Sequence, residues 1–485
     1  MRRRNRSGWP LLAVLLLAVS CSGGTSSTSA AKGEGGGGDD AHPNIVVVIT
    51  DDQTVEMMRA LPTTRRLLGG AGTTFARASV ALPLCCPARA TLLTGQYPHT
   101  HGVRDNVAPA GGFSRLSWDD TIAVDLQEAG YRTAHVGRTL NDYTVDARPL
   151  VPPGWDEWYT PIEDRSRSFI SRGSSLVANG EIRTLGGTTH LDDALAAISL
   201  ELVDEMVDDE LPFYLELGFV APHTSRPGPN QDAGLPVPAD RHQGEAEGLP
   251  LAHEFGSVEP GKPAWVAERQ NRSEDQTGVY WRRALESLRA VDEAVDSLVS
   301  RLRRSGELSS TVIVFTSDNG ITLGEHGLSI DKVIPYEPAV HIPLLVRGPG
   351  FAHEVVDVPV SHVDVAPTIL RAAGIAVPGE MEGVALQDAV DEPDRAARWV
   401  LLVESTPFAR PAPPFWQVRS GSLVLTRYDD GSAELSDLAD DPDQHENRID
   451  DPRYADDVAA LDGFGRSLRT CRGPGCIVYD DQERP

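Results

Sequence analysis

The chain has 485 residues, which is too many for one small core and enough for a large domain with a smaller subdomain. Hydrophobic residues make up 40% of it, the ordinary content of a globular protein, and the formal net charge is -27. Such an acidic balance disfavours non-specific binding to nucleic acid, although a locally basic site can still bind an anionic substrate. We therefore expect no nucleic-acid partner.

The N-terminal segment resembles an export signal. Arginines at positions 2, 3, 4 and 6 precede a short apolar run, Leu11 to Val19, which is too short to span a bilayer comfortably. The run ends at Ala18-Val19-Ser20-Cys21, which resembles a bacterial lipoprotein cleavage box. We expect residues 1–21 to hold the signal, with a lipid on Cys21. An ordinary signal peptide cut nearby is the alternative.

Residues 22–42 are rich in Gly, Ser and Thr and offer no apolar surface to bury. This composition predicts a flexible tether between the N-terminus and the fold. Together with the signal it predicts an exported protein, either secreted or held at the cell surface as a lipoprotein. The only membrane contact we expect is the lipid.

The first predicted strand covers Asn44 to Thr50, a continuous run rich in β-branched residues. Such a run is typical of a central strand that is covered on both faces. Asp51 and Asp52 follow at its C-terminal end, where open α/β sheets bind ligands. Adjacent carboxylates repel each other unless a cation lies between them. A solvated turn is the alternative.

A predicted helix begins at Cys85-Cys86-Pro87-Ala88-Arg89. Proline suits the first turn of a helix, and the free N–H groups and positive dipole end would face Cys85. With the added charge of Arg89, such a place lowers a thiol pKa and binds an anion. The alternative is two buried cysteines, or a vicinal disulfide, beside a structural arginine.

Strands and helices then alternate, which indicates a largely parallel, helix-covered sheet. Residues 225–275 are polar, with many Gly and Pro, which predicts a long loop near the substrate; a disordered segment is the alternative. The predicted elements are a helix over 121–129 capped by Gly130, a strand over 131–137, a helix over 191–208, a strand over 212–220 and an amphipathic helix over 280–304.

A second buried strand, Thr311 to Thr316, ends in Ser317-Asp318-Asn319-Gly320. Its end is like that of the first strand: an apolar run, a threonine, then oxygen-bearing side chains. Three carboxylates and one amide from the two ends suit a hard cation, calcium or magnesium. For Asp318-Asn319-Gly320 alone, a plain turn is the alternative.

The last part of the chain predicts short strands from about Trp399, including 417–419 and 423–426. Near the C-terminus, Cys471 and Cys476 enclose Arg-Gly-Pro-Gly, a tight turn. In an exported chain this spacing predicts a disulfide, and two free thiols are the alternative.

The stretch from Leu84 to His99 closely resembles the signature of the type I sulfatases. In that family a Cys-x-Pro-Ser-Arg core is read by a maturation enzyme, which oxidises the cysteine to formylglycine. The resemblance places formylglycine (3-oxoalanine) at Cys85, with Cys86 at the free position and Ala88 where serine is usual. The double cysteine is most similar to N-acetylglucosamine-6-sulfatases and the extracellular heparan endosulfatases.

This resemblance covers residues 43 to about 475 and implies an alkaline-phosphatase-like α/β fold. We expect a catalytic domain over 43–395, built on a large, mostly parallel sheet covered by helices. A C-terminal subdomain with a small antiparallel sheet would follow over 396–485. Glu434 to Leu438, followed by Asp441-Pro442, resembles the family's C-terminal sheet signature.

The resemblance also implies the site residues. It implies metal ligands at Asp51, Asp52, Cys85, Asp318 and Asn319, with Ca²⁺ or Mg²⁺ as the ion. It implies catalytic and sulfate-binding side chains at Arg89, Arg138, His223 and Lys332, with His326 as a supporting substrate contact.

Two positions depart from the family pattern. Arg138 stands in a Gly-Lys-Tyr-Leu-Asn segment where lysine is usual, and Leu140 stands where many arylsulfatases have histidine. Arginine keeps the positive charge and can bind an oxyanion through two N–H groups, but it does not readily donate a proton. The glucosamine-6-sulfatase group shares the missing histidine, so Leu140 favours that subgroup.

The implied activity is hydrolysis of sulfate esters of a sulfated sugar or glycosaminoglycan. The geminal diol of residue 85 would attack sulfur, form a covalent sulfo-enzyme, then collapse to the aldehyde and expel sulfate. His223 or Lys332 would protonate the leaving oxygen. One alternative is a phosphoric or phosphonic ester hydrolase of the same superfamily. The other is a lipoprotein that binds sulfated glycans with an unconverted Cys85.

Overall fold

The computed structural model describes residues 42–144, 146, 150–163, 169–209, 211–228, 234–252, 256–269, 273–397, 399–408 and 412–480. The predicted signal, the lipid on Cys21 and nearly all of the tether lie outside these residues. The described residues from His42 to Asp480 belong to one compact unit, so the division at 395/396 stays a prediction. Among the described residues, no helix has the length and apolarity that a membrane span requires.

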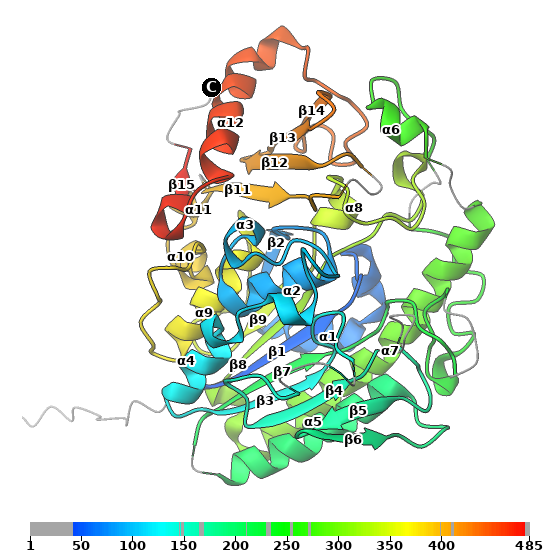
Figure 1. Ribbon diagram of the computed structural model, residues 1–485, viewed down its shortest axis with the longest axis vertical. Helices are drawn as coiled ribbons and strands as arrows, with labels where there is room; N and C mark the ends of the chain where they lie inside the picture. Colours follow the sequence, from blue (N-terminus) through cyan, green and yellow to red (C-terminus); the bar gives the residue numbers. More distant parts are fainter. Residues whose placement is uncertain are drawn as a thin grey trace, which may run out of the picture. The chain divides into compact units, whose positions relative to one another are not determined.

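A ten-stranded mixed sheet forms the centre of this unit (Figure 1). The pairs β1–β7, β1–β8, β3–β7, β3–β4 and β2–β10 are parallel, and the remaining pairs are antiparallel. From edge to edge, the order is β10 (Glu354–Ser361), β2 (Thr73–Ser79), β9 (Leu344–Arg347), β8 (Thr311–Ser317), β1 (Asn44–Thr50), β7 (Phe213–Gly218), β3 (Arg132–Gly137), β4 (Glu157–Pro161), β5 (Ser175–Ala178) and β6 (Glu181–Thr184).

Alternate residues of β1 belong to two different hydrophobic cores. Val46 and Val48 pack with α5 (Leu191–Asp208) and α7 (Glu274–Ser305). Ile45, Val47 and Ile49 belong to the other core, with α2 (Cys85–Thr94), α4 (Ile122–Glu128) and α9 (Val365–Ala372). All seven residues of β1 are buried. The prediction of a central strand covered on both faces is therefore confirmed.

The predicted helices agree with the structure within a few residues, except at the start of α7. This helix begins at Glu274, six residues before the predicted Tyr280, because Ser273 and Gln276 form a capping box at its N-terminus. The segment predicted to be irregular, 225–275, contains only short helices before α7 among its described residues. The remaining short α-helices are α1 (Pro62–Leu67), α3 (Pro98–His101), α6 (Ala264–Ala267), α8 (Glu337–Val340), α10 (Leu386–Asp391) and α11 (Pro393–Ala396).

A second, smaller sheet is antiparallel and has five strands (Figure 1). Its inner face packs on α12 (Ala455–Leu468) around Leu402, Val418 and Leu461. This confirms the predicted small C-terminal sheet. Its order is β14 (Ala433–Asp437), β13 (Leu423–Tyr428), β12 (Phe415–Ser420), β11 (Trp399–Glu404) and β15 (Val478–Tyr479).

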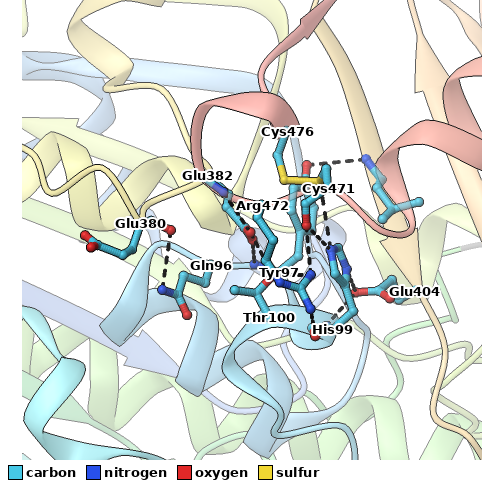
Figure 2. The surroundings of a disulfide bond; sticks show 12 residues. Gln96, Tyr97, His99, Thr100, Glu380, Glu382, Glu404, Cys471, Arg472 and Cys476 are labelled. Carbon is cyan, nitrogen blue, oxygen red and sulfur yellow. Dashed lines mark hydrogen bonds and ion pairs between the residues drawn. A yellow bond between two sulfur atoms is a disulfide. The ribbon is translucent and has the colours of Figure 1, made fainter.

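The C-terminal segment is tied to α3 by a disulfide-closed loop (Figure 2). Cys471 and Cys476 are bonded, and the loop between them carries Arg472. The Arg472 guanidinium donates to Thr100 Oγ1 at 3.1 Å and to the His99 carbonyl at 3.2 Å. Because α3 follows α2 closely in the chain, this loop braces the region of α2 that carries Cys85 and Cys86.

Candidate active site

Helix α2 places Cys85 and Cys86 in its first turn, deep in the protein. All ten residues of the helix are buried, and Gly95 ends it in the left-handed conformation that favours glycine. Both cysteines are free thiols. Their sulfurs have different partners, since Cys85 faces Lys332 whereas Cys86 faces Asn141. The alternative of a vicinal disulfide does not apply to this structure.

The Cys85 sulfur lies 3.0 Å from Lys332 Nζ and 3.8 Å from Asp51 Oδ1. Burial raises the pKa of Cys85 to about 12, although the nearby Lys332 charge lowers it. The expectation of a lowered thiol pKa is therefore wrong for the unmodified residue. Arg89 does not stabilise a thiolate at Cys85, because the charge of Arg89 is already neutralised by Asp51 and Asp318.

The carboxylates predicted to bind a metal come together at the C-terminal ends of β1 and β8. The two strands pair in register, Thr50 opposite Ser317, so the residues that follow them are neighbours. One oxygen from each of Asp51, Asp52 and Asp318 lies within 4.8 Å of the others. Asp52 has a φ of 64°, in the left-handed region, which is uncommon for a residue other than glycine. This strain is stored where the carboxylates converge.

Three cations surround these carboxylates. Arg89 bridges Asp318 at 2.9 Å and Asp51 at 3.3 Å, and Lys332 pairs with Asp52 at 2.7 Å. Arg138 also contacts the Asp51 carboxylate. Removing one partner from such a buried set is costly because it leaves an uncompensated charge.

The oxygen donors fit a hard divalent cation. Asn319 Oδ1 is buried and has no hydrogen-bond partner among the described residues, while Asn319 Nδ2 donates to Asp52 Oδ1 at 2.6 Å. A buried, unpartnered amide oxygen beside three carboxylates is the donor set that Ca²⁺ or Mg²⁺ prefers. The residues present therefore agree with the cation predicted from the two strand ends.

His223 faces the carboxylates from the loop after β7. Its Nε2 lies 3.7 Å from Asp52 Oδ2, and its Nδ1 lies 2.7 Å from the Thr224 carbonyl oxygen. The Nδ1 must carry the proton in that bond, since a carbonyl only accepts. Burial, Arg138 and Lys332 lower the pKa of His223, so the neutral ring turns an unprotonated Nε2 to the site.

Arg138 follows β3 where two glycines let the backbones approach closely. A Cβ on Gly137 would lie 1.9 Å from the Gly218 carbonyl oxygen, and one on Gly218 would lie 2.6 Å from that of Arg138. The open space at Gly218 lets Arg89 Nη1 donate to the Arg138 carbonyl at 2.8 Å. The fixed backbone then presents the Arg138 guanidinium to Asp51.

We call these side chains the Cys85 cluster. It contains eight of the residues predicted from the sequence together with Cys85 itself, and all of them are linked by direct contacts. Its members are Asp51, Asp52, Cys85, Arg89, Arg138, His223, Asp318, Asn319 and Lys332.

His326, predicted as a supporting residue, has other partners. Its Nδ1 bonds to Glu259 at 2.9 Å, and its ring packs on Tyr336 and His445. Within the described residues, these contacts lie outside the Cys85 cluster. His326 instead lines a cavity of about 850 Å³ together with Glu325 and His445.

Sequence reasoning assigned no role to Asn141 or Phe169, yet both hold Arg138. Asn141 Oδ1 accepts from Arg138 Nη2 at 3.2 Å, and the Phe169 ring centroid lies 5.0 Å from the guanidinium carbon. The place of Asn141, three residues after Arg138, was the only available signal for it. Phe169 lies 31 positions away in the printed sequence, so nothing local pointed to it.

A family model described as "Sulfatase" matches residues 43–375, more than half of the chain. The chain belongs to the sulfatase family. A second model, "N-sulphoglucosamine sulphohydrolase, C-terminal", matches residues 324–464 of this sulfatase-family chain and so spans most of the small sheet. The sequence-based assignment to the family is confirmed.

Curated sulfatases resemble the chain at about one third identity. N-acetylglucosamine-6-sulfatase of Homo sapiens is 34% identical over 350 residues, which are 68% of this chain and 60% of that protein. A putative extracellular sulfatase Sulf-1 homolog of Caenorhabditis elegans is 34% identical over 349 residues, 69% of this chain and 46% of that protein. The aligned part thus spans about half the length of these relatives.

Solved structures share the fold at lower identity. BT4656, solved in complex with D-glucosamine-2-N,6-O-disulfate, has a TM-score of 0.75 and 22% identity, covering 88% of this chain and 97% of that one. The phosphonate monoester hydrolase SpPMH from Silicibacter pomeroyi has a TM-score of 0.69 and 20% identity, covering 89% and 96%. The predicted sulfatase fold is confirmed.

Proposed function

We propose that this sulfatase-family protein hydrolyses sulfate esters of a sulfated sugar, in the manner of an N-acetylglucosamine-6-sulfatase. One observation carries the proposal: the Cys85 sulfur lies between Lys332 Nζ and the Asp51 carboxylate, in a cluster of three carboxylates. The curated N-acetylglucosamine-6-sulfatases and the glucosamine disulfate in the similar structure support a sulfated sugar, as in a glycosaminoglycan, as the substrate class.

The nucleophile we propose is formylglycine, made from Cys85 by a formylglycine-generating enzyme. As a hydrated aldehyde, residue 85 supplies two hydroxyl groups. One attacks the sulfate sulfur as the alcohol leaves, and the other then expels sulfate and restores the aldehyde. The unmodified thiol would be a poor substitute, because burial keeps Cys85 protonated near neutral pH.

Asp51, Asp52, Asp318 and Asn319, with residue 85, would hold the divalent cation, calcium or magnesium. When bound, such an ion supplies Lewis-acid polarisation of a sulfate oxygen. The protein's own cations do the remaining electrostatic work. Arg138 and Lys332 would face the sulfuryl oxygens, and the neutral His223 would contribute a hydrogen bond only once its Nε2 carries a proton, while Arg89 fixes two of the carboxylates.

Two side chains are suited to protonate the leaving oxygen. Lys332 carries a full ammonium charge in contact with residue 85, and His223 turns its Nε2 toward Asp52. His223 would need to gain a proton on that nitrogen first, since its Nδ1 proton is held by the Thr224 carbonyl. Both residues stay candidates for the general acid.

Peptide mass spectrometry on the protein from its own host tests this proposal. Trypsin releases Ala78 to Arg89, which contains residue 85. We expect the aldehyde at that residue and turnover of 6-sulfated glucosamine. An unmodified cysteine, in a host that matures other sulfatases, would contradict the catalytic proposal and favour a glycan-binding lipoprotein.

A phosphonic or phosphoric ester hydrolase is the second candidate, because the fold is shared with a phosphonate monoester hydrolase. Rates on matched aryl sulfate, phosphate and phosphonate esters separate the two. We expect the sulfate ester to have the highest kcat/KM. Faster cleavage of either phosphorus ester would overturn the proposed substrate class.

We also propose that the protein is exported and carries a lipid on Cys21. The export signal read from the sequence supports this location, and curated relatives include extracellular sulfatases. Mass spectrometry of the mature N-terminus is the test. A diacylglyceryl-modified Cys21 is expected, whereas an unmodified N-terminus at another residue would indicate an ordinary secreted protein.

A further inference from the structure

Cys86, the second cysteine of the pair, has a buried sulfur with polar partners. Its side chain is fully buried, and a cysteine thiol is ordinarily neutral at pH 7, so its S–H can donate a hydrogen bond. The Cys86 sulfur accepts a hydrogen bond from the Asn141 backbone N, 2.9 Å away, and lies 3.3 Å from Asn141 Oδ1. Asn106 Oδ1 accepts the backbone N–H of Cys86 at 2.9 Å, which fixes this turn of α2.

Asn141, held in place by Cys86, in turn hydrogen-bonds to Arg138. Its Oδ1 lies between two donors, the Cys86 thiol and Arg138 Nη2, the latter at 3.2 Å. Both arginine and a neutral thiol can donate there, so the oxygen, not the amide nitrogen, must face them. The thiol thus holds the asparagine both through its main chain and through its side chain.

The Arg138 guanidinium needs such an anchor because its other contacts do not set its rotation alone. It touches Asp51 on one side and lies over the Phe169 ring at 5.0 Å. A ring face permits the planar group to turn, whereas a hydrogen bond to Nη2 fixes the plane. A fixed plane matters for an arginine that binds an oxyanion through two N–H groups.

We propose that Cys86 is a positioning residue, which orients Arg138 for the sulfate group through Asn141. The inference rests on the proposed function, because it takes Arg138 as a sulfate contact. It assigns a task to the residue between Cys85 and Pro87, a position that the maturation signature leaves free. In this chain position 138 holds arginine in place of lysine. The longer, planar guanidinium of arginine needs its orientation fixed, and Cys86 and Asn141 would fix it.

The test compares Cys86→Ala and Cys86→Ser with the wild type, each also in an Arg138→Ala background. For every variant, peptide mass spectrometry gives the converted fraction of residue 85, and rates are expressed per converted molecule. Isothermal titration with inorganic sulfate gives a Kd that does not depend on turnover. Thr94→Val is the matched control, since it removes another buried hydrogen bond of α2, to the Ala90 carbonyl, away from Asn141.

We expect Cys86→Ala to lower kcat/KM and to weaken sulfate binding by about tenfold, the effect of losing the hydrogen bond from the charged Arg138 to Asn141 when the anchor of Asn141 is removed. Cys86→Ser, which keeps a donor and an acceptor, should recover about half of that loss on a logarithmic scale. In the Arg138→Ala background, Cys86→Ala should change neither quantity by more than about twofold, because the coupled partner is gone. Thr94→Val should leave both unchanged.

Equal losses with and without Arg138, or unchanged sulfate affinity in Cys86→Ala, would overturn the inference. If Cys86→Ala does not fold, Cys86→Ser decides by the same comparison. A wild-type protein without aldehyde and without turnover would contradict the proposed function. In that case the sulfate Kd alone still judges Cys86, and a wild type that binds no sulfate would overturn the inference as well.

Discussion

Lys332 Nζ lies 3.0 Å from Cys85 Sγ and 2.7 Å from Asp52 Oδ1. One ammonium group therefore links the residue proposed as the nucleophile to a residue proposed as a metal ligand. Burial lowers the pKa of Lys332, but the Asp52 carboxylate and the other acidic groups around it together raise it by more, so Lys332 carries its charge throughout the neutral range. This charge is available to stabilise whatever negative charge develops beside residue 85.

Lys332→Ala should lower kcat by about a hundredfold to a thousandfold, because it removes an electrostatic contact next to the nucleophile. Conversion of residue 85 should be unchanged, since Lys332 lies far outside the maturation signature in sequence. Steady-state kinetics and the tryptic peptide mass measure the two effects separately. A variant with full conversion and wild-type kcat would exclude Lys332 from the reaction.

Removal of the divalent cation should abolish activity without unfolding the protein. Arg89 and Lys332 still compensate the carboxylates in the metal-free state. Dialysis against a chelator tests this, and re-addition of Ca²⁺ at about 100 times its Kd should raise the free energy of unfolding by about 2.7 kcal/mol. Asp318→Asn should weaken this response, whereas Asp450→Asn, an exposed control, should not. An unchanged Tm on adding Ca²⁺ or Mg²⁺ would argue against the site.

Gly218→Ala should destabilise the protein by about 1–3 kcal/mol, because its Cβ would press on the Arg138 carbonyl 2.6 Å away and on Arg89 Nη1 at 3.2 Å. Activity should fall with it, since both arginines belong to the Cys85 cluster. Gly463→Ala is the matched control: it lies on the exposed side of α12, with nothing within 4 Å of its Cβ. Urea unfolding should show that the control is neutral or slightly stabilising. Equal effects of the two substitutions would contradict the close-approach argument.

Replacing both cysteines of the disulfide, Cys471→Ser with Cys476→Ser, should cost about 2 kcal/mol, as expected for a short closed loop. The loss should appear locally as well, because Arg472 then holds Thr100 and the His99 carbonyl less firmly (Figure 2). Hydrogen exchange should speed up in α3 more than in the central sheet. Wild type treated with a reductant is the control and should behave alike. Unchanged exchange in α3 would show that the loop does not brace it.

Acidification should destabilise the protein partly through His362. This side chain is fully buried, its Nε2 donates to the Ser317 carbonyl at 3.0 Å, and burial lowers its pKa to about 4. Between about pH 6.5 and pH 4 this histidine is protonated in the unfolded chain but stays neutral in the folded protein. Stability is therefore lost as pH falls, by up to about 1.4 kcal/mol per pH unit from this residue.

His362→Gln provides the comparison, since an amide N–H can replace the Nε2 donor but does not titrate. The difference in the free energy of unfolding between wild type and variant should shrink or reverse from pH 7 to pH 4.5. Urea titrations at several pH values measure it. Parallel pH curves for the two proteins would mean that His362 has the same pKa in the folded and the unfolded chain.

The sequence predicted the parts of the site that follow strands or share a motif. Asp51 and Asp318 were paired because each follows a buried apolar run, and β1 and β8 indeed lie side by side. The thiol pKa was predicted wrongly, since helix position and Arg89 are visible in a sequence whereas full burial and the counter-ions of Arg89 are not. His326 matched a motif but turns to Glu259, a contact set by the tertiary structure.

The roles of Asn141 and Phe169 could not be predicted from local patterns. Cys86 and Asn141 are 55 residues apart, and their contact depends on how α2 packs against the segment after β3. Periodicity places residues on a face of a helix or strand but does not give the side-chain partner across a core. The same limit applies to Gly218, whose need for glycine arises from Arg89 and Arg138.

The burial of Cys85 has a consequence for the newly made chain. Its closest cationic partner, Lys332, comes 247 residues later, and β8, the neighbour of β1, is also made late. At about 5–20 residues per second, a ribosome needs roughly 12–50 s to add that length. Until then the thiol cannot be enclosed, and afterwards no enzyme can touch it without unfolding the site. An enzyme that modifies Cys85 would therefore act on the chain before the site folds around this residue.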